Sequence, residues 1–304
     1  MRKRPAKYGC ETTNEFSMKH AAKSGVGRTL MCQASVQIEQ SAINLGGISM
    51  KFLSFFVLSL SVFVLIVRAA GEDKSFAEKG SFVTLKHGDG REFRAFVAGP
   101  ADAKAGVLIV HDYFGISEAT KQSVQRLGAL GYRSVAVDLY GGKSATSNDE
   151  AVKLMRSLDE TTSSKILQAG LDYLKRPGRK LATIGFSMGG QESLNANLND
   201  PEAVRASVVV YGSGFDKIDT KRLERLESPV LVIAGAEDSA AVQAAINFLA
   251  TMKEAKRPCE MLVYPGADHG YAQPLFNGGK NYNPAAIRTT WILVEDFLGS
   301  HLRP

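Results

Sequence analysis

Short apolar runs alternate with longer, helix-length stretches through most of the chain. The apolar runs are continuous and rich in valine and isoleucine, and they cover residues 106–110, 134–139, 181–186, 206–211 and 229–235. Strands of this kind are buried on both faces, as in a parallel sheet. The stretches of helical length between them are 118–130, 150–158, 165–174 and 240–253. This order predicts an α/β fold with a mostly parallel, doubly wound sheet, helices on both faces and right-handed crossovers.

The two ends of this body show other patterns. Residues 82–86, FVTLK, and 92–99, EFRAFVAG, alternate more regularly on either side of HGDGR, which predicts an opening antiparallel hairpin. At the C-terminus, apolar residues recur every three or four positions, and this spacing predicts one face of a closing helix. The residues of that stripe are Ile287, Trp291, Val294, Leu298 and Leu302.

The N-terminal third contains a separate apolar segment. Sixteen uncharged, mostly apolar residues, 52–67, stand between Lys51 and Arg68 and are followed by small residues. This layout predicts a secretory signal peptide over 50–71 and export to the periplasm or the cell exterior. The alternative is a membrane anchor if residues 51–68 stay uncleaved, although sixteen residues fall short of the ~20 that span a bilayer. We interpret residues 1–49 as a disordered extension, upstream of a native start at Met50.

The remaining residues, 72–304, are enough for one α/β domain. The chain has 37 Lys+Arg and 31 Asp+Glu, of which residues 1–70 hold 9 and 3, so the body carries 28 of each sign. A neutral body without a basic patch gives no support to nucleic-acid binding. A processed chain keeps only Cys259, which excludes an intrachain disulfide and a cysteine-rich metal site.

The hexapeptide GFSMGG places Ser187 directly after a predicted strand and before the helix-like QESLNANLN. A Gly-x-Ser-x-Gly pattern alone is weak, since about one chain in ten of this length has it by chance. In a nucleophile elbow, however, the serine is strained, and glycines two residues on either side are required because larger side chains collide across the turn. Gly185 and Gly189 meet that requirement. The backbone N–H of Met188 then faces the position of an oxyanion at a helix N-terminus.

A serine hydroxyl needs a base to remove its proton and a carboxylate to orient that base. In this type of fold both follow the serine in chain order, each after a later strand. His269 follows the strand-like MLVY, and Asp238 ends PVLVIAGAED. The order Ser187, Asp238, His269 therefore predicts a catalytic triad.

Each member also has a structural interpretation. Ser187 is a candidate helix N-cap and His269 an ordinary loop residue. Asp238 is a candidate cap for the following helix, in which case Glu237 or Asp268 takes its place in the triad. Two further histidines, His87 and His111, are interpreted as structural or solvated.

A phosphate-binding loop is the rival motif. YGGKS at 140–144 is similar to the end of such a loop, but the full pattern needs a glycine where Val137 stands. No Gly-x-Gly-x-x-Gly pattern is present either. Nucleotide binding is therefore not expected, and neither a cofactor nor a metal is expected for a triad hydrolase.

Several blocks of the body together resemble the dienelactone hydrolase family of α/β-hydrolases, over about residues 82–302. The blocks are VLIVHDYFGISEATKQSVQRLGALGYRSVAVDLYGG, GFSMGG, VLVIAGAED, YPGADHGY and NYNPAAIRTTWILVEDFL. The resemblance implies an α/β-hydrolase fold without a cap domain, a triad of Ser187, Asp238 and His269, and hydrolysis of an ester or lactone. It also implies that the N–H of Tyr113 supplies the second oxyanion contact, beside that of Met188.

The chain departs from the archetypal members of that family at two places. Those members have a cysteine nucleophile and a nearby glutamate, where this chain has Ser187 and Asp112. A serine cannot rest as a thiolate, so a conventional serine esterase is expected, and Asp112 is either a substrate-site residue or a solvated or helix-capping carboxylate. The archetype also binds its substrate's carboxylate with arginines, including one in the stretch that here reads SATSND. Lys143 and Lys280 are the candidate replacements, and dienelactone itself is not the expected substrate.

The sequence thus predicts an exported serine hydrolase, a carboxylic ester hydrolase that acts on a small ester or lactone through an acyl-enzyme. With no cap insertion, long acyl chains are not expected. The second hypothesis is a catalytically silent relative that binds a ligand or partner in the same cleft.

Mass spectrometry of the native exported protein tests the interpretation of the N-terminus. We expect a mature chain that begins close to residue 70 or 72, because the small residues after the apolar segment fit a cleavage site. A mature chain that begins anywhere before Met50 would contradict the signal-peptide prediction.

Overall fold

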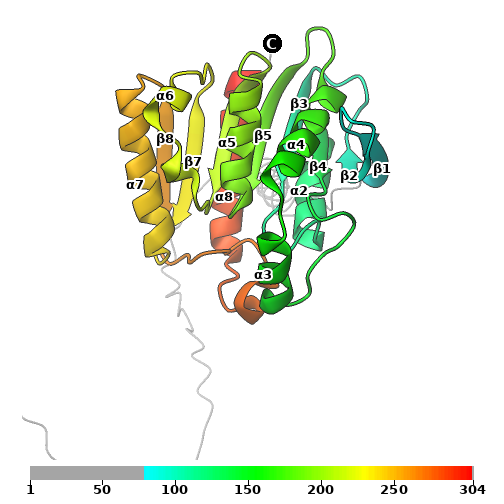
Figure 1. The fold of residues 1–304 in the computed structure, drawn as a ribbon. Coiled ribbons are helices and arrows are strands. Elements are labelled where there is room, and N and C mark those ends of the chain that lie inside the picture. The colour runs from blue at the N-terminus through cyan, green and yellow to red at the C-terminus, as the bar shows by residue number, and fades with distance from the viewer. Residues whose placement is uncertain (1–78, 303–304) are drawn as a thin grey trace, which may run out of the picture. The chain divides into compact units, whose positions relative to one another are not determined.

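The computed structural model of the 304-residue chain describes residues 79–302. One eight-stranded sheet runs through this part of the chain (Figure 1), in the order β1-β2-β4-β3-β5-β6-β7-β8. The strands are β1 Ser81–Lys86, β2 Glu92–Ala98, β3 Ala105–Val110, β4 Arg133–Val137, β5 Lys180–Phe186, β6 Val204–Val210, β7 Val230–Gly235 and β8 Cys259–Tyr264. The predicted extension, 1–49, and the predicted signal segment, 50–71, lie outside the described residues. Among residues 79–302, no helix combines the length and the apolar character that a membrane crossing requires.

Six strands, β3 to β8, pair in parallel, and β1 and β2 form an antiparallel hairpin at one edge. The hairpin joins the sheet through an antiparallel pairing of β2 with β4. Every residue of β3 and of β7 is buried, which is why their sequences are apolar without alternation. The mostly parallel sheet and the opening hairpin are therefore confirmed.

Helices cover both faces of the sheet. They are α2 Glu118–Ala129, α3 Asn148–Arg156, α4 Glu160–Leu174, α5 Gly189–Asn199, α6 Thr220–Leu223, α7 Ser239–Glu254 and α8 Pro284–Leu302, with 3₁₀ segments η1 Phe215–Lys217 and η2 Phe276–Gly279. Apolar residues of α2 and α8 share one core cluster, and those of α4, α5 and α7 contribute to two others. In Figure 1, α4, α5 and α7 lie in front of the sheet and α8 behind it. The described residues form the doubly wound α/β-hydrolase architecture, without a cap domain.

The closing helix, α8, buries the predicted stripe. Trp291, Val294, Leu298 and Leu302 are each less than a tenth exposed, and Ile287 packs against the same cluster. The intervening Ile292 is 65% exposed, as the helical period requires. The spacing of the apolar residues therefore predicted both the helix and its buried face.

Two helices begin earlier than their apolar patterns predict. The helix expected at 165–174 starts at Glu160, because Asp159 caps it by accepting a hydrogen bond from the Thr162 N–H at 2.7 Å. The helix expected at 150–158 spans Asn148–Arg156 and is capped by Ser147. In both cases a side-chain cap, and not the hydrophobic period, determines the first turn.

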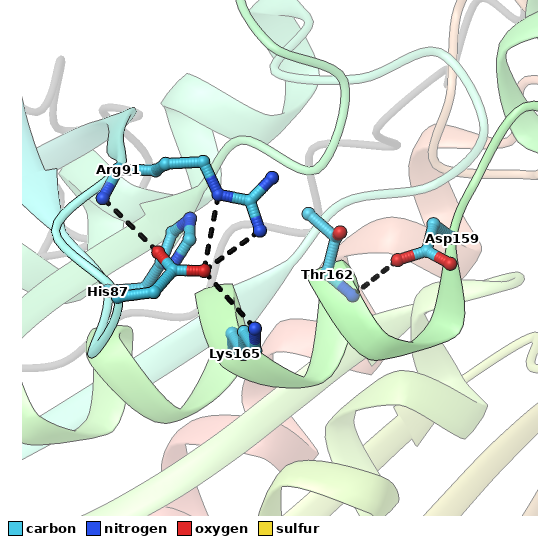
Figure 2. Close-up of polar contacts among 6 residues, drawn as sticks. His87, Arg91, Asp159, Thr162 and Lys165 are labelled. Carbon is cyan, nitrogen blue, oxygen red and sulfur yellow. Dashed lines mark hydrogen bonds and ion pairs between the residues drawn. The ribbon is translucent and has the colours of Figure 1, made fainter.

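Asp89, the unlabelled carboxylate between Arg91 and Lys165 in Figure 2, connects the hairpin turn between β1 and β2 to α4. One carboxylate oxygen accepts a hydrogen bond from Arg91 Nη2 at 2.8 Å and lies 3.1 Å from Lys165 Nζ of α4. These contacts, that of Arg91 above all, hold the pKa of Asp89 well below its usual range. The antiparallel edge of the sheet is thereby joined to a helix that covers the parallel strands.

Candidate active site

Ser187 occupies a strained turn between β5 and α5. Its backbone has a φ of +53°, in the left-handed region that non-glycine residues rarely adopt. Backbone hydrogen bonds hold the turn: the Ser187 N–H donates to the Val210 oxygen at 3.1 Å, and the Ser187 oxygen accepts from the N–H groups of Gly190 at 2.9 Å and Ser213 at 3.2 Å. The turn presents the serine side chain at the carboxyl edge of the sheet, at the start of α5.

The glycines on either side make this turn sterically possible. A Cβ on Gly185 would stand 1.9 Å from the Gly189 oxygen, and a Cβ on Gly189 would stand 2.5 Å from the backbone oxygens of Val110 and His111. All of these are backbone atoms, which cannot move aside as the end of a flexible side chain can. The predicted collision across the turn is thus present at both positions.

The structure brings Ser187, His269 and Asp238 into one hydrogen-bonded chain. Ser187 Oγ lies 2.8 Å from His269 Nε2, and His269 Nδ1 lies 2.5 Å from Asp238 Oδ2. With the carboxylate at Nδ1, the neutral ring carries its proton on that nitrogen, and Nε2 accepts the hydrogen bond of the serine. This arrangement can take up a proton from the serine hydroxyl.

The Asp238 carboxylate both orients the His269 ring and caps a helix, so the two roles predicted for it are present together. While Oδ2 faces the His269 ring, Oδ1 accepts a hydrogen bond from the Ala241 N–H at 3.0 Å and so caps α7. Burial raises the pKa of this carboxyl, but the hydrogen bonds from His269 and Ala241 outweigh it, and the net shift is downward. Within residues 79–302, the predicted alternative Asp268 accepts a hydrogen bond from the backbone N–H of His269, at 2.7 Å, and none from its ring.

Aromatic side chains and an amide hold the His269 loop. The His269 ring packs edge-on against Tyr211 at a centroid distance of 5.6 Å and in a tilted orientation against Phe276 at 5.2 Å. Asn281 Nδ2 donates a hydrogen bond to the His269 backbone oxygen at 2.8 Å. Sequence reasoning assigned none of the three a role: Tyr211 ends another strand, Phe276 lies in a loop without a motif, and Asn281 begins the block NYNPAAIRTTWILVEDFL, which was used only for the family resemblance.

The two expected oxyanion donors have no protein acceptor. Among the hydrogen bonds of residues 79–302, none starts from the backbone N–H of Met188 or of Tyr113. Met188 immediately precedes α5, whose N-terminus favours a negative charge. The Tyr113 hydroxyl donates to Asn148 Oδ1 of α3 at 3.1 Å, and this contact joins the loop after β3 to α3.

Asp112 is neither solvated nor a helix cap, which corrects the structural alternative for this residue. It is 5% exposed, and its oxygens accept hydrogen bonds from the Phe114 N–H at 2.9 Å and from Gln273 Nε2 at 2.8 Å. Burial raises its pKa against the effect of these hydrogen bonds. Gln273 was missed by the sequence analysis because no motif contains it.

The histidines interpreted as structural or solvated, His87 and His111, are both buried. His111 Nδ1 lies 2.6 Å from the Asp112 backbone oxygen, and Nε2 accepts a hydrogen bond from the Leu139 N–H at 3.3 Å. Burial lowers the pKa of His111 and keeps the ring neutral. His111 therefore has a structural role, and the solvated alternative is wrong for both residues.

A cavity of about 570 Å³ adjoins the site, between α2 and α8. Asp112, Phe186, Tyr211, Arg126 and Arg288 are among the residues that line it, whereas Ser187 and His269 are not. Lys143 and Lys280, the candidate substrate-binding cations, are exposed and do not line this cavity. In the described part of the chain, no three histidine, cysteine or acidic side chains are grouped as metal ligands.

This chain is similar to several known proteins. The family model described as "Dienelactone hydrolase family" matches residues 93–302. "Protein usf" of Aquifex pyrophilus is 26% identical over 231 residues, which cover 70% of this chain and 96% of that protein. "Carboxymethylenebutenolidase" of Pseudomonas putida is 27% identical over 169 residues, 51% of this chain and 70% of that enzyme. The crystal structure of the dienelactone hydrolase-like promiscuous phosphotriesterase P91 superposes with a TM-score of 0.64 at 21% identity, over 74% of this chain and 99% of that one.

Replacement of Gly189 tests the steric basis of the turn. We expect Gly189→Ala to lower the free energy of unfolding by about 1–3 kcal/mol, because the new methyl group meets fixed backbone oxygens. Urea denaturation measures this change. The matched control is Gly88→Ala, since a Cβ at Gly88 meets nothing within 4 Å. Equal stability of the two variants would contradict the packing described.

Proposed function

Because this chain belongs to the dienelactone hydrolase family, whose model matches residues 93–302, we propose that it is a serine hydrolase that cleaves a small carboxylic ester or lactone. The observation that carries the proposal is the chain of contacts from Ser187 Oγ to His269 Nε2, 2.8 Å, and from His269 Nδ1 to Asp238 Oδ2, 2.5 Å. A hydrogen-bonded hydroxyl, imidazole and carboxylate form the arrangement that activates a serine.

In the proposed reaction, His269 accepts the hydroxyl proton as Ser187 Oγ attacks the substrate carbonyl. Asp238 holds the ring in the required tautomer and stabilises the positive charge that develops on it. The imidazolium then gives its proton to the leaving alcohol oxygen, and an acyl-enzyme on Ser187 results. Water, deprotonated by His269, releases the acid and regenerates the serine. For a lactone, the leaving oxygen becomes a hydroxyl group on the acyl chain, and hydrolysis of the acyl-enzyme then releases a hydroxy acid.

The N–H groups of Met188 and Tyr113 receive the negative charge on the carbonyl oxygen. Both lack a protein acceptor in the described residues, and Met188 stands at a helix N-terminus. Donors that are already oriented stabilise the tetrahedral intermediate without reorganisation, and each contributes about 3–4 kcal/mol in other hydrolases.

The substrate class follows from the shape of the site and from the relatives. The described residues carry no cap domain that would enclose a long acyl chain. A carboxymethylenebutenolidase is among the relatives, which supports a lactone or a small ester. Lys143 and Lys280 are exposed, and no described contact connects either of them to Ser187 or His269, so we do not assign them to substrate binding.

We also propose that the enzyme acts outside the cytoplasm. The support is the apolar segment 52–67 with small residues after it, which is typical of an export signal.

Hydrolysis of 4-nitrophenyl acetate tests the proposal. We expect the wild-type protein to release nitrophenolate with burst or steady-state kinetics, and Ser187→Ala to lower kcat at least about 1,000-fold, because the nucleophile is lost. The control, Ser300→Ala, removes an exposed hydroxyl in the last turns of α8 and should leave kcat unchanged. A folded wild-type protein without esterase activity would favour the silent-relative hypothesis instead.

The length of the acyl chain provides a separate test. We expect kcat/KM to be highest for acetyl and butyryl esters and to fall for longer chains, because residues 79–302 form no cap domain that would bury them. A series of 4-nitrophenyl esters measures this dependence. Preference for a dodecanoyl or palmitoyl ester over butyrate would contradict a small-substrate site.

A further inference from the structure

The loop after β3 is shaped by the side chain of Asp112. Asp112 Oδ1 accepts a hydrogen bond from the Phe114 N–H at 2.9 Å, and its backbone oxygen accepts one from the Gly115 N–H at 3.1 Å. An aspartate that binds a backbone N–H two residues onward closes a local turn. The N–H groups of Phe114 and Gly115 are thus bonded to Asp112, whereas that of the preceding residue, Tyr113, has no acceptor among the described residues. Asp112 therefore fixes the peptide that carries the second proposed oxyanion donor.

The other oxygen of Asp112 is held by Gln273, from a loop far along the chain. Gln273 Nε2 lies 2.8 Å from Asp112 Oδ2 and 3.1 Å from Ser117 Oγ, so both of its amide hydrogens have acceptors. The backbone N–H of Gln273 donates to the Gly270 oxygen at 2.8 Å, which closes the turn directly after His269. One side chain thus joins the loop of the base to the loop of the oxyanion donor.

Burial makes this contact costly to disturb. Gln273 is 1% exposed and Asp112 is 5% exposed. The side-chain oxygen of Gln273, Oε1, also has a partner, because it accepts a hydrogen bond from the Leu275 N–H at 3.3 Å. A buried polar pair with all groups satisfied is rigid, whereas one with a missing partner leaves a desolvated carboxylate oxygen. The two loops consequently have one well-defined relative position.

We propose that Asp112 and Gln273 are positioning residues. By fixing the peptide that carries the Tyr113 N–H, they hold the oxyanion site in the correct position relative to Ser187 and His269. This inference rests on the proposed serine hydrolase function and extends it to a pair of residues that touch neither the nucleophile nor the base by a hydrogen bond. The pair contributes in the transition state, since the oxyanion forms only there. Its removal should lower kcat and leave KM nearly unchanged.

Asp138 provides a matched control within the same fold. It follows the neighbouring strand β4, is 3% exposed, and accepts hydrogen bonds from the backbone N–H groups of Tyr140 and Gly142 at 2.8 and 2.6 Å. Its carboxylate closes a local turn as that of Asp112 does, but among the hydrogen bonds of residues 79–302 none joins it to the His269 loop. Replacement of Asp138 reports the cost of losing a buried turn carboxylate without the proposed positioning.

The test compares Gln273→Met, Asp112→Ala, Asp112→Asn and Asp138→Ala with the wild-type protein. Kinetics with 4-nitrophenyl acetate and inhibition by phenylboronic acid, whose serine adduct places an oxygen in the oxyanion site, are the two measurements. For Gln273→Met and Asp112→Ala we expect kcat to fall about 10- to 100-fold, with KM within about threefold, and boronate affinity to weaken in parallel. Asp112→Asn should recover part of the activity, because its Oδ1 can still accept the Phe114 N–H.

Asp138→Ala should retain a kcat within about twofold of wild type, whatever its stability. If Asp112→Ala does not fold, Gln273→Met decides the matter, because methionine fills the same space without donors. Unchanged kcat and boronate affinity in Gln273→Met, or an equal loss in Asp138→Ala, would overturn the inference while leaving the hydrolase function intact. A wild-type protein that cleaves no ester and forms no boronate adduct would overturn the proposed function together with the inference.

Discussion

The left-handed turn at Ser187 is the constraint on which the rest of the site depends. A backbone φ of +53° places the serine at the edge of the sheet and the next N–H at the start of α5. The strain of such a residue, of order 1–3 kcal/mol, persists only where the surroundings enforce it. Here β6 holds the turn, because the Ser187 N–H donates a hydrogen bond to the Val210 oxygen. The turn also requires glycine at positions 185 and 189, where the surrounding backbone leaves no room for a side chain.

The other two residues of the site depend on loops that follow later strands. His269 is useful only if its ring stands between Ser187 and Asp238, and the ring is held there by Tyr211, Phe276 and the backbone contact with Asn281. Asp238 meets two demands at once, because one oxygen caps α7 and the other orients the ring. The buried pair of Asp112 and Gln273 adds a connection between the loops after β3 and β8. The parallel sheet brings these loops together, since the carboxyl ends of its strands share one edge.

Local patterns in the sequence predicted the parts of this structure that local physics determines. Continuous apolar runs indicated the parallel strands, the spacing from Ile287 to Leu302 indicated the buried face of α8, and the order of Ser187, Asp238 and His269 indicated which side chains meet. Contacts between distant loops could not be found in this way. Gln273 is an ordinary polar residue until the fold buries it beside Asp112, and the first turn of α4 depends on the Asp159 cap more than on apolar spacing. Lys143 and Lys280 were chosen for their charge alone, and the fold leaves both exposed.

The central claim is that the surroundings of Ser187 make its hydroxyl nucleophilic. Intact-mass spectrometry after exposure to a fluorophosphonate tests it most directly, because the reagent labels serines that have both a base and an oxyanion site. We predict a single adduct on the wild-type protein, none on Ser187→Ala, and much slower labelling of His269→Ala. A correctly folded wild-type protein that gains no adduct, or an adduct that survives in Ser187→Ala, would contradict the account.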